Sequence, residues 1–469
     1  MMPAKTSTDE TGHIDRRIGP YTATSIVVAN MIGAGIFTTS GIVAAQVPGA
    51  GWVIVCYLLG GMIALSGALC YAELATRMPE EGGEYVYLKK LYHPALGFLT
   101  GWTSFLAGFS APIAASALGF AEYISPGFNR HLPSMSSAGV TIEKKAIAAA
   151  IILLFTIVHY VGIRLGSIVQ NTLTAIKIAI VLGLASLGLI FGFIHGHWGG
   201  TAFSLATAGG TGTVAFGSAM MLVMFAYSGW NASAYIAGEL KNPRRTLPLS
   251  LLGGTGIVII LYLAVNIFVL QSVPFDVLKV TKPVLEEASR RAFGDWIGNV
   301  LGMLAGLALL SSLSAYIILG PRVYYAMAQD RLFFPLAARV HKRFGVPGAS
   351  ILLQGAIAML MVAFGTLEQI AFYVGFALGI FPWLAVIGVF LARKKGIGEE
   401  SAARVWGYPV VPVFYLISSL ALMIIAYIND PSDSSIALIS IAFGIPCYFL
   451  LVKTIKPERV TRSHSAPFQ

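Results

Sequence analysis

Charged side chains are scarce in this sequence. Asp, Glu, Lys and Arg make up 11% of its 469 residues, whereas 56% are hydrophobic. So few charges cannot cover the surface of a soluble domain of this size, and the mean hydropathy of +0.77 leads to the same conclusion. The composition therefore predicts a chain solvated by lipid. Its apolar runs, such as 146–159, 168–194 and 251–270, approach or exceed the length that crosses a bilayer and lack the alternation of a β-barrel.

Cysteine is also rare, with three residues that all lie inside apolar runs: Cys56, Cys70 and Cys447. They have no paired spacing, which argues against a disulfide framework or a zinc site and favours packing in the core. No metal-ligand spacing of histidines, catalytic Ser/His/Asp set or phosphate-cradling glycine loop is present. We therefore expect a protein that is not an enzyme and has neither a cofactor nor a metal.

The net charge of +10 does not indicate nucleic-acid binding, because the sequence contains no soluble domain that could carry a basic face. Hydropathy, punctuated by Gly, Pro and charge clusters, instead divides the chain into twelve candidate membrane spans. We place them at 21–45, 52–76, 92–123, 146–161, 168–193, 213–237, 249–271, 297–328, 350–364, 369–392, 410–427 and 436–452.

Basic residues are distributed unevenly over the two sides of this division. If the amino terminus is inside, the inner segments hold 23 of the 31 Lys and Arg residues, the outer loops hold seven, and Lys177 falls within the fifth span. Because positive charge is retained on the cytoplasmic face, both termini are expected there. Residues 1–19 are polar, lack a cleavage-type signal and are interpreted as a cytoplasmic tail, and 453–469 as a second one. The expected location is a cell membrane, inner or plasma.

Two glycines interrupt the middle of the first span, in the run Asn30 to Phe37 (NMIGAGIF). Small residues often let membrane helices approach closely, and for an isolated pair that is the better interpretation. The functional alternative is a broken helix. Its second half would then offer free amides to a carboxylate at the positive end of the helix dipole, and the carbonyls of its first half could hold an ammonium.

A second interruption, Phe225 to Asn231 (FAYSGWN), lies in the middle of the sixth span. Glycine breaks at matching places in two halves are typical of inverted repeats with a substrate site at the midplane. The repeats would be 20–195, with spans one to five, and 212–392, with spans six to ten. Spans eleven and twelve, in 410–452, lie outside the repeat.

Lys177 is the most informative single residue, because a lysine at membrane depth is costly unless it faces a cavity or a partner. It lies more than a turn inside the apolar run 171–190, which argues against snorkelling. Its ammonium could take the place of a sodium ion, with bonds to main-chain carbonyls of the broken first helix. Hydroxyl partners from the eighth span would be Ser311, Ser312 or Ser314.

Other ionisable residues lie near predicted span ends, where solvated pairing or contact with water and headgroups is the usual interpretation. This group comprises Glu73, Glu84 and Glu239, which lie beside Arg77, Lys89 and Lys241, and the histidines His159, His195 and His197. We assign them no transport chemistry.

The chain resembles the amino acid-polyamine-organocation transporters, and among them the L-type amino acid transporters and their bacterial relatives. The resemblance covers essentially all twelve spans. It is most specific in FAYSGWNASAYIAGELKNPRRTLP at 225–248, and it extends to GAGIF at 33–37 and PEEGGEYVYL at 79–88. It implies an all-α membrane protein with the five-plus-five inverted-repeat fold and broken first and sixth helices.

The resemblance also implies positions for the substrate. The carboxylate of an amino acid would lie at the amides around Gly33, Gly35 and Ile36. Its ammonium would meet the carbonyls of the residues grouped around the two breaks, Ile32, Phe225, Ala226 and Ser228. The ring of Phe225 would form the outer gate, and Lys177 falls where sodium-independent members carry a lysine.

Two departures from the family pattern refine the expectation. Residues 125–145 contain no cysteine, although L-type light subunits use one there to bond a heavy chain, so no such partner is expected. Ser228 stands where some members have glycine, which argues against very large aromatic substrates. We expect a sodium-independent carrier of neutral amino acids, either an exchanger or a proton symporter. A cationic amino acid or polyamine carrier is the alternative, but it would favour an acidic residue in the pocket, and spans one, six and eight supply none at the midplane.

Overall fold

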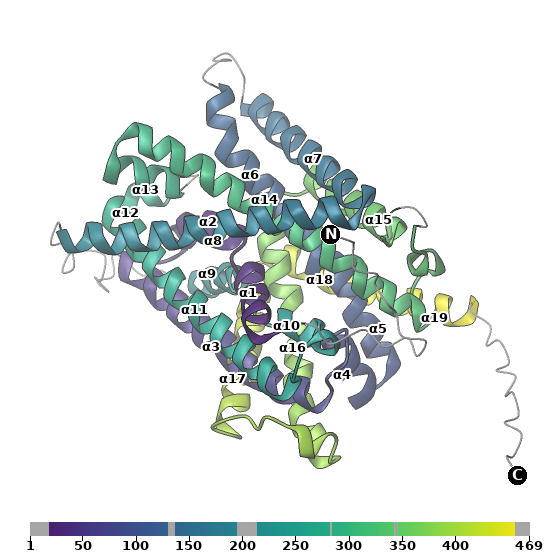
Figure 1. Ribbon diagram of the computed structural model, residues 1–469. Coiled ribbons are helices and arrows are strands. Elements are labelled where there is room, and N and C mark those ends of the chain that lie inside the picture. Colours follow the sequence, from purple (N-terminus) through teal and green to yellow (C-terminus); the bar gives the residue numbers. More distant parts are fainter. Residues whose placement is uncertain are drawn as a thin grey trace, which may run out of the picture.

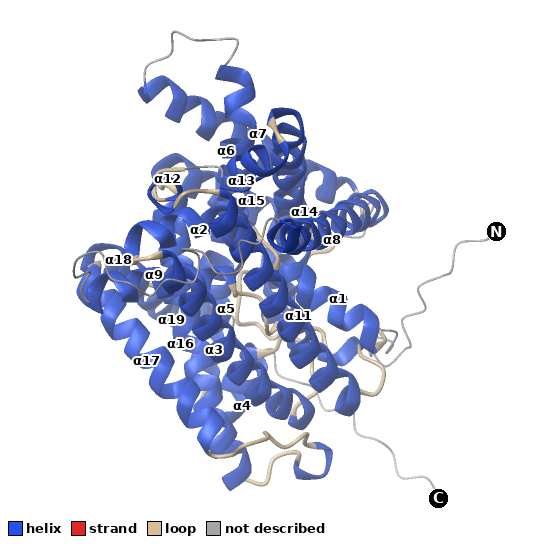
Figure 2. Cartoon of the chain, turned by 90° about the vertical axis from the view of Figure 1, so that its left-hand side faces the viewer, coloured by secondary structure: helices blue, strands red, loops and turns tan. Residues whose placement is uncertain are grey.

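The computed structural model describes residues 18–129, 137–194, 213–281, 284–341, 344 and 346–454. The expected tails lie outside this range at residues 1–17 and 455–469, as do the loop 195–212, with His195 and His197, and residues 130–136 of the expected outer loop. Within the described part the chain is helical, with one isolated bridge between Ile18 and Leu240 and no extended strand (Figure 2).

Ten α-helices precede the middle of the chain, and π-helical turn η1 (Ser104–Ser110) continues α5 into α6. Their bounds are α1 Pro20–Met31, α2 Ala34–Gln46, α3 Ala50–Arg77, α4 Glu84–Leu91, α5 Pro94–Thr103, α6 Ala111–Asn129, α7 Ser137–Val161, α8 Ile163–Ile194, α9 Thr213–Ala226 and α10 Ala232–Tyr235.

The second half of the chain adds nine α-helices and short 3₁₀ turns in its loops. The helices are α11 Pro243–Ser272, α12 Phe275–Leu278, α13 Val284–Phe293, α14 Asp295–Gln329, α15 Gly348–Phe364, α16 Leu367–Lys394, α17 Val410–Asn429, α18 Pro431–Ala442 and α19 Gly444–Thr454. The turns are η4 Ala237–Glu239, η5 Pro335–Ala338 and η6 Glu399–Ser401.

Nine helical stretches in the described part of the chain are long and apolar enough to cross a membrane, and two shorter apolar helices at 215–226 and 348–364 accompany them. Large apolar side chains stay exposed around their outer faces, for example Ile260, Phe364 and Ile417. An exposed apolar belt of this kind suits lipid contact, because water would penalise it. The chain is therefore a multi-pass membrane protein.

Helix lengths differ from the expected spans at several ends. The helix of the fourth span begins at Ser137 rather than Ala146, and that of the fifth begins at Ile163 rather than Ile168. Both extensions carry charged residues, because backbone hydrogen bonding continues a helix past its apolar stretch into the interface. The expected twelfth span is divided into α18 and α19 at Phe443.

Short helices lie at the centre of the bundle. Figure 1 shows α1 and α10 in the middle of the view, with α8 running across above them. α1 packs against α11, α2 against α9, and α8 against both α11 and α14. The interrupted ends of the broken helices therefore lie inside the protein, where their unpaired backbone groups need partners.

Candidate functional site

The first span is interrupted between α1, which ends at Met31, and α2, which begins at Ala34. Ile32 and Gly33 have non-helical backbone angles, with φ/ψ of −72°/87° and −128°/−157°. The last carbonyls of α1 and the first amides of α2 therefore lack the helical partners that a continuous helix would provide. In water such groups would be solvated, whereas inside a membrane protein they need side chains, ordered water or a ligand as partners.

Lys177 of α8 binds the end of α1. Its Nζ donates to the carbonyl oxygens of Ala29 at 2.7 Å and Ile32 at 2.8 Å, and to Ser312 Oγ at 3.0 Å. Its side chain is completely buried. An ammonium has three N–H donors, and each has one acceptor here, which offsets the large cost of placing this group away from water. The structure places Lys177 at the broken helix, and its part in coupling stays a prediction.

One of the three serines expected beside Lys177 reaches it. Ser312 Oγ accepts from Lys177 and lies 3.0 Å from the Ile32 carbonyl oxygen. Ser311 instead lies 3.2 Å from Thr174 Oγ1, and Ser314 lies 2.8 Å from His159 Nε2. Consecutive helical residues point in directions about 100° apart, so the expectation for Ser311 was wrong. His159 is buried by this contact rather than exposed to water or headgroups.

The sixth span is interrupted in the same way. α9 ends at Ala226, residues 227–231 form turns, and α10 begins at Ala232. Gly229 adopts a φ of +92°, and a Cβ atom there would lie 3.1 Å from the carbonyl carbon and oxygen of Asn30. Both the left-handed backbone and this close approach suit glycine. The two interruptions therefore pack directly against each other.

Tyr262 of α11 links the two interruptions. Its buried hydroxyl lies 2.5 Å from the Met31 carbonyl oxygen and 3.0 Å from the Ala226 carbonyl oxygen. These carbonyls end α1 and α9, respectively. One phenol thus serves the ends of both half-helices.

The two glycines at the start of α2 have different surroundings. A Cβ atom on Gly35 would lie 2.2 Å from Ala226 Cα, far inside contact distance, so this position admits only glycine without a shift of α9. A Cβ atom on Gly33 would meet nothing closer than Tyr316 Oη at 3.6 Å. Gly35 therefore permits the contact between helices, whereas a Cβ atom on Gly33 would make only ordinary van der Waals contacts.

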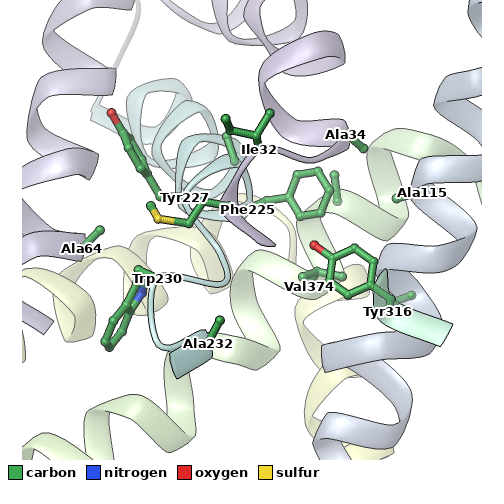
Figure 3. Close-up of a cluster of buried hydrophobic side chains, with 14 of the residues drawn as sticks. Ile32, Ala34, Ala64, Ala115, Phe225, Tyr227, Trp230, Ala232, Tyr316 and Val374 are labelled. Atoms are coloured by element: carbon green, nitrogen blue, oxygen red, sulfur yellow. The ribbon is translucent and has the colours of Figure 1, made fainter. Parts of the chain in front are cut away.

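A small cavity lies between the two interruptions. Figure 3 shows Phe225, Ala34 and Tyr316 on the same side of the break, with Phe225 emerging from the end of α9. Phe225 is 4% exposed. The residues that line the cavity are Met31, Gly33, Ala34, Gly35, Pro112, Ser116, Phe225, Ser228 and Tyr316.

Ser116 of α6 belongs to this lining and was not anticipated from the sequence. Its hydroxyl is buried without a hydrogen-bond partner among the described residues. A buried hydroxyl that faces a cavity without a partner is placed to bond whatever fills that cavity. A serine in an apolar third span gave no signal of this role, because small polar residues are common at helix contacts.

A larger cavity adjoins the first and shares Pro112, Ser228 and Tyr316 with it. Turn η1 contributes Ser104, Gly108 and Phe109 to its wall, as π-helical turns frequently do at functional sites. Glu84, at the start of α4, also lines it. Spans one, six and eight contain no acidic residue at the midplane. The short helix α4 supplies one to the wall of the larger cavity instead.

The expectation of a solvated Glu84 was wrong. The residue is 4% exposed, and Asn231 Nδ2 donates to its carboxyl oxygen at 2.5 Å. The preceding Gly82 and Gly83 have φ of +108° and +52°, which turns the chain back beneath the cavity. Glu73 pairs with Arg77 as expected, but its carboxylate is fully buried and also binds Arg393.

Comparison with known proteins places this geometry in context. A family model described as "Amino acid permease" matches residues 18–450. The serine/threonine exchanger SteT of Bacillus subtilis is 28% identical over 450 residues, 95% of this chain and 99% of its own length. The human b(0,+)-type amino acid transporter 1 is 28% identical over 94% of this chain and 89% of its own. The human Asc-type amino acid transporter 1 is 25% identical over 93% of this chain and 82% of its own.

Proposed function

Because the chain belongs to the amino acid permease family, we propose that it carries neutral L-amino acids across the membrane by alternating access, without sodium. The family makes it an amino acid transporter rather than an enzyme. The similarity to a serine/threonine exchanger over almost the full length of both proteins favours small neutral substrates and exchange.

The observation that carries the proposal is the triple hydrogen bond of Lys177. Its ammonium binds two carbonyls of the α1 end and the Ser312 hydroxyl, a set of oxygen ligands that would otherwise suit a sodium ion. An ammonium covalently attached to α8 at this place takes the position of a dissociable cation. It supports a sodium-independent cycle with Lys177 and Ser312 in the coupling position.

We place the substrate in the small cavity between the interruptions. Its carboxylate lies at the first amides of α2, around Gly33, Gly35 and Ile36, where the helix dipole favours negative charge. Its ammonium binds carbonyl oxygens of the second interruption, which span Phe225 to Ser228.

The Ile32 carbonyl has a different role from the one expected. It accepts from Lys177 and lies at bonding distance from Ser312, which occupies both of its lone pairs. We therefore assign it to Lys177 rather than to the substrate. Phe225 covers the cavity and forms the outer gate.

The repeat organisation follows from the same proposal. Residues 20–195 and 212–392 form two inverted repeats of five spans, and 410–452 supplies spans eleven and twelve. With the basic clusters on the inner side, both termini are cytoplasmic and Glu84 lies on the cytoplasmic side of the larger cavity. No disulfide-linked heavy chain is needed for transport in this proposal.

A cationic amino acid or polyamine carrier is the second candidate, and Glu84 favours it. A carboxylate in the wall of the larger cavity could bind a positively charged side chain. Lysine and arginine would then compete with serine for uptake, whereas the leading proposal expects alanine, serine and threonine to compete and lysine not to.

Uptake into proteoliposomes tests the proposal. Purified protein is reconstituted without sodium, and entry of radiolabelled serine is compared between empty vesicles and vesicles loaded with unlabelled serine. Stimulation by internal serine, with saturation by external serine, is the expected result for an exchanger. Accumulation in empty vesicles under a proton gradient would instead identify a symporter, and uptake in neither case or only with sodium would refute the proposal.

A further inference from the structure

A carboxyl group lines the larger cavity, and no lysine or arginine of the described residues forms an ion pair with it. Glu84 lines this cavity together with Ser228 and Tyr316, and only 4% of its surface is exposed. Its helix, α4, lies between the candidate spans 50–77 and 94–125 and outside both. We propose that Glu84 is a proton-binding site that holds its proton while this part of the cavity is shut and releases it to water when that part opens.

The groups around Glu84 explain why a proton suits it. Asn231 Nδ2 donates to the carboxyl at 2.5 Å. The other ionisable groups that interact with it are phenols, which are uncharged at neutral pH. They are Tyr71 of α3, Tyr87 of α4 itself, Tyr235 of α10 and Tyr415 of α17.

The basic groups nearby are bound elsewhere. No lysine or arginine forms an ion pair with Glu84 in the part of the chain that the structure describes. Lys89 pairs with Asp330, Lys90 with Glu80 and Arg393 with Glu73, and Lys395 donates to the Leu91 carbonyl oxygen. An ionised Glu84 would therefore be a buried charge without a counter-charge, which is strongly unfavourable.

Burial raises the pKa of the Glu84 carboxyl from its ordinary 4.5 to about 7, against the opposing effect of its hydrogen bonds, among them that from Asn231. When water reaches the group, its pKa returns toward the ordinary value. The shut state has the raised pKa, so it is favoured at low pH and loses that advantage as pH rises through 7. With these two values the opening equilibrium rises roughly tenfold between pH 6 and pH 8.

The position of Asn231 connects this proton to transport. Asn231 ends the second interruption and directly precedes α10, the inner half of the broken helix. Its bond to Glu84 ties that half-helix to α4. Loss of the proton leaves a carboxylate that requires water, and water enters only if α4 and α10 separate. The proposal rests on the alternating-access function above, because it requires a cavity that opens.

Hydrogen–deuterium exchange of the detergent-solubilised protein tests the proposal without any substrate. Exchange of peptides covering 225–240 is measured at pH 6 and pH 8 and corrected for the pH dependence of intrinsic amide exchange. Wild-type protein should show about a tenfold increase in opening. E84Q keeps the size of the carboxyl but cannot ionise, so its corrected exchange should not change with pH.

Two further variants make the result specific. E80Q is the matched control, because Glu80 lies nearby on the same loop and forms an exposed pair with Lys90. It should behave like wild type. In N231A the carboxylate loses a donor, which raises the pKa of Glu84 and shifts the transition to higher pH, so this variant reports even if E84Q folds poorly.

Three results would overturn the proposal: wild-type exchange that does not change with pH, E84Q exchange with the wild-type pH dependence, or thermal stabilisation by arginine that E84Q abolishes. The last would make Glu84 a site for cationic side chains instead. Serine counterflow at constant pH is measured in parallel. Its absence refutes the proposed function, whereas normal counterflow with a pH-independent opening refutes only the role of Glu84.

Discussion

Lys177 Nζ lies 2.8 Å from the carbonyl oxygen of Ile32, so the middle of the fifth span holds the open end of the first. The lysine replaces helical hydrogen bonds that the interruption removes from α1. This makes the break in the first helix depend on a side chain far away in the sequence.

Replacement of Lys177 by Ala should nearly abolish transport. The carbonyls of Ala29 and Ile32 lose a charged donor, and about 3 kcal/mol of lost stabilisation at the break corresponds to roughly a hundredfold lower rate. The measurement is serine counterflow, with size-exclusion chromatography to show that the variant remains folded in detergent. Wild-type turnover would remove Lys177 from the mechanism.

The neighbouring serines allow a matched comparison. S312A removes an acceptor from Lys177 and a hydroxyl from the Ile32 carbonyl, and it should lower the counterflow rate at least about tenfold, as expected for one hydrogen bond to a charged group. S311A, one residue earlier on α14, removes only a contact with Thr174 and should retain most activity. Equal losses in the two variants would contradict the assignment.

Phe225→Ala should impair occlusion of the substrate more than expression. The ring lines the cavity in which we place the substrate. If it forms the gate, its loss opens that cavity to solvent, so bound serine should dissociate at least several-fold faster in a filter-binding assay. Phe216→Ala is the control on the same helix, where the ring packs against Trp52. Unchanged dissociation in Phe225→Ala would disprove the gate.

Gly33→Ala and Gly35→Ala should impair different properties, serine affinity in the first and thermal stability in the second. The new Cβ atom on Gly35 meets Ala226 Cα at 2.2 Å, and such overpacking costs about 1–3 kcal/mol, so the melting temperature should fall. The new Cβ atom on Gly33 fits but borders the substrate cavity, so serine affinity should fall at a nearly unchanged melting temperature. The reverse pattern would contradict the geometry of the first interruption.

Ser116→Ala tests the unpaired hydroxyl in the cavity. If the Ser116 hydroxyl bonds the side chain of a hydroxylated substrate, KM for serine should rise about fivefold in the variant, while KM for alanine should be nearly unchanged. Competition uptake with the two amino acids measures this difference. An equal effect on both would assign Ser116 to packing.

The sequence alone was sufficient to predict the parts of the site that violate general rules for membrane helices. A lysine in an apolar span and glycines in the middle of two helices are conspicuous because they are costly, and the structure brings Lys177 to the first interruption as predicted. The sequence does not give the rotation of α14 about its axis, so it could not distinguish Ser312 from Ser311 as the partner of Lys177.

Glu84 was missed for a different reason. A glutamate near a span end beside a lysine is usually solvated, and only the path of the backbone decides otherwise. Gly82 and Gly83 turn the backbone at this point. Two glycines in a loop, however, predict a flexible segment as readily as a turn into a buried helix. The sequence around Ser116 carries no distinguishing signal, because its significance depends on the cavity that its hydroxyl lines.

Tyr262 imposes a further restriction on movement at the centre of the protein. A phenol has one hydrogen, and two carbonyl oxygens, those of Met31 and Ala226, lie within its reach. The hydroxyl hydrogen can be donated to only one of these oxygens at any instant. The carbonyl at the end of the other half-helix therefore requires a second donor. In the function proposed above, the ammonium of a bound substrate is that donor, so substrate binding would complete the hydrogen bonding of the two half-helix ends.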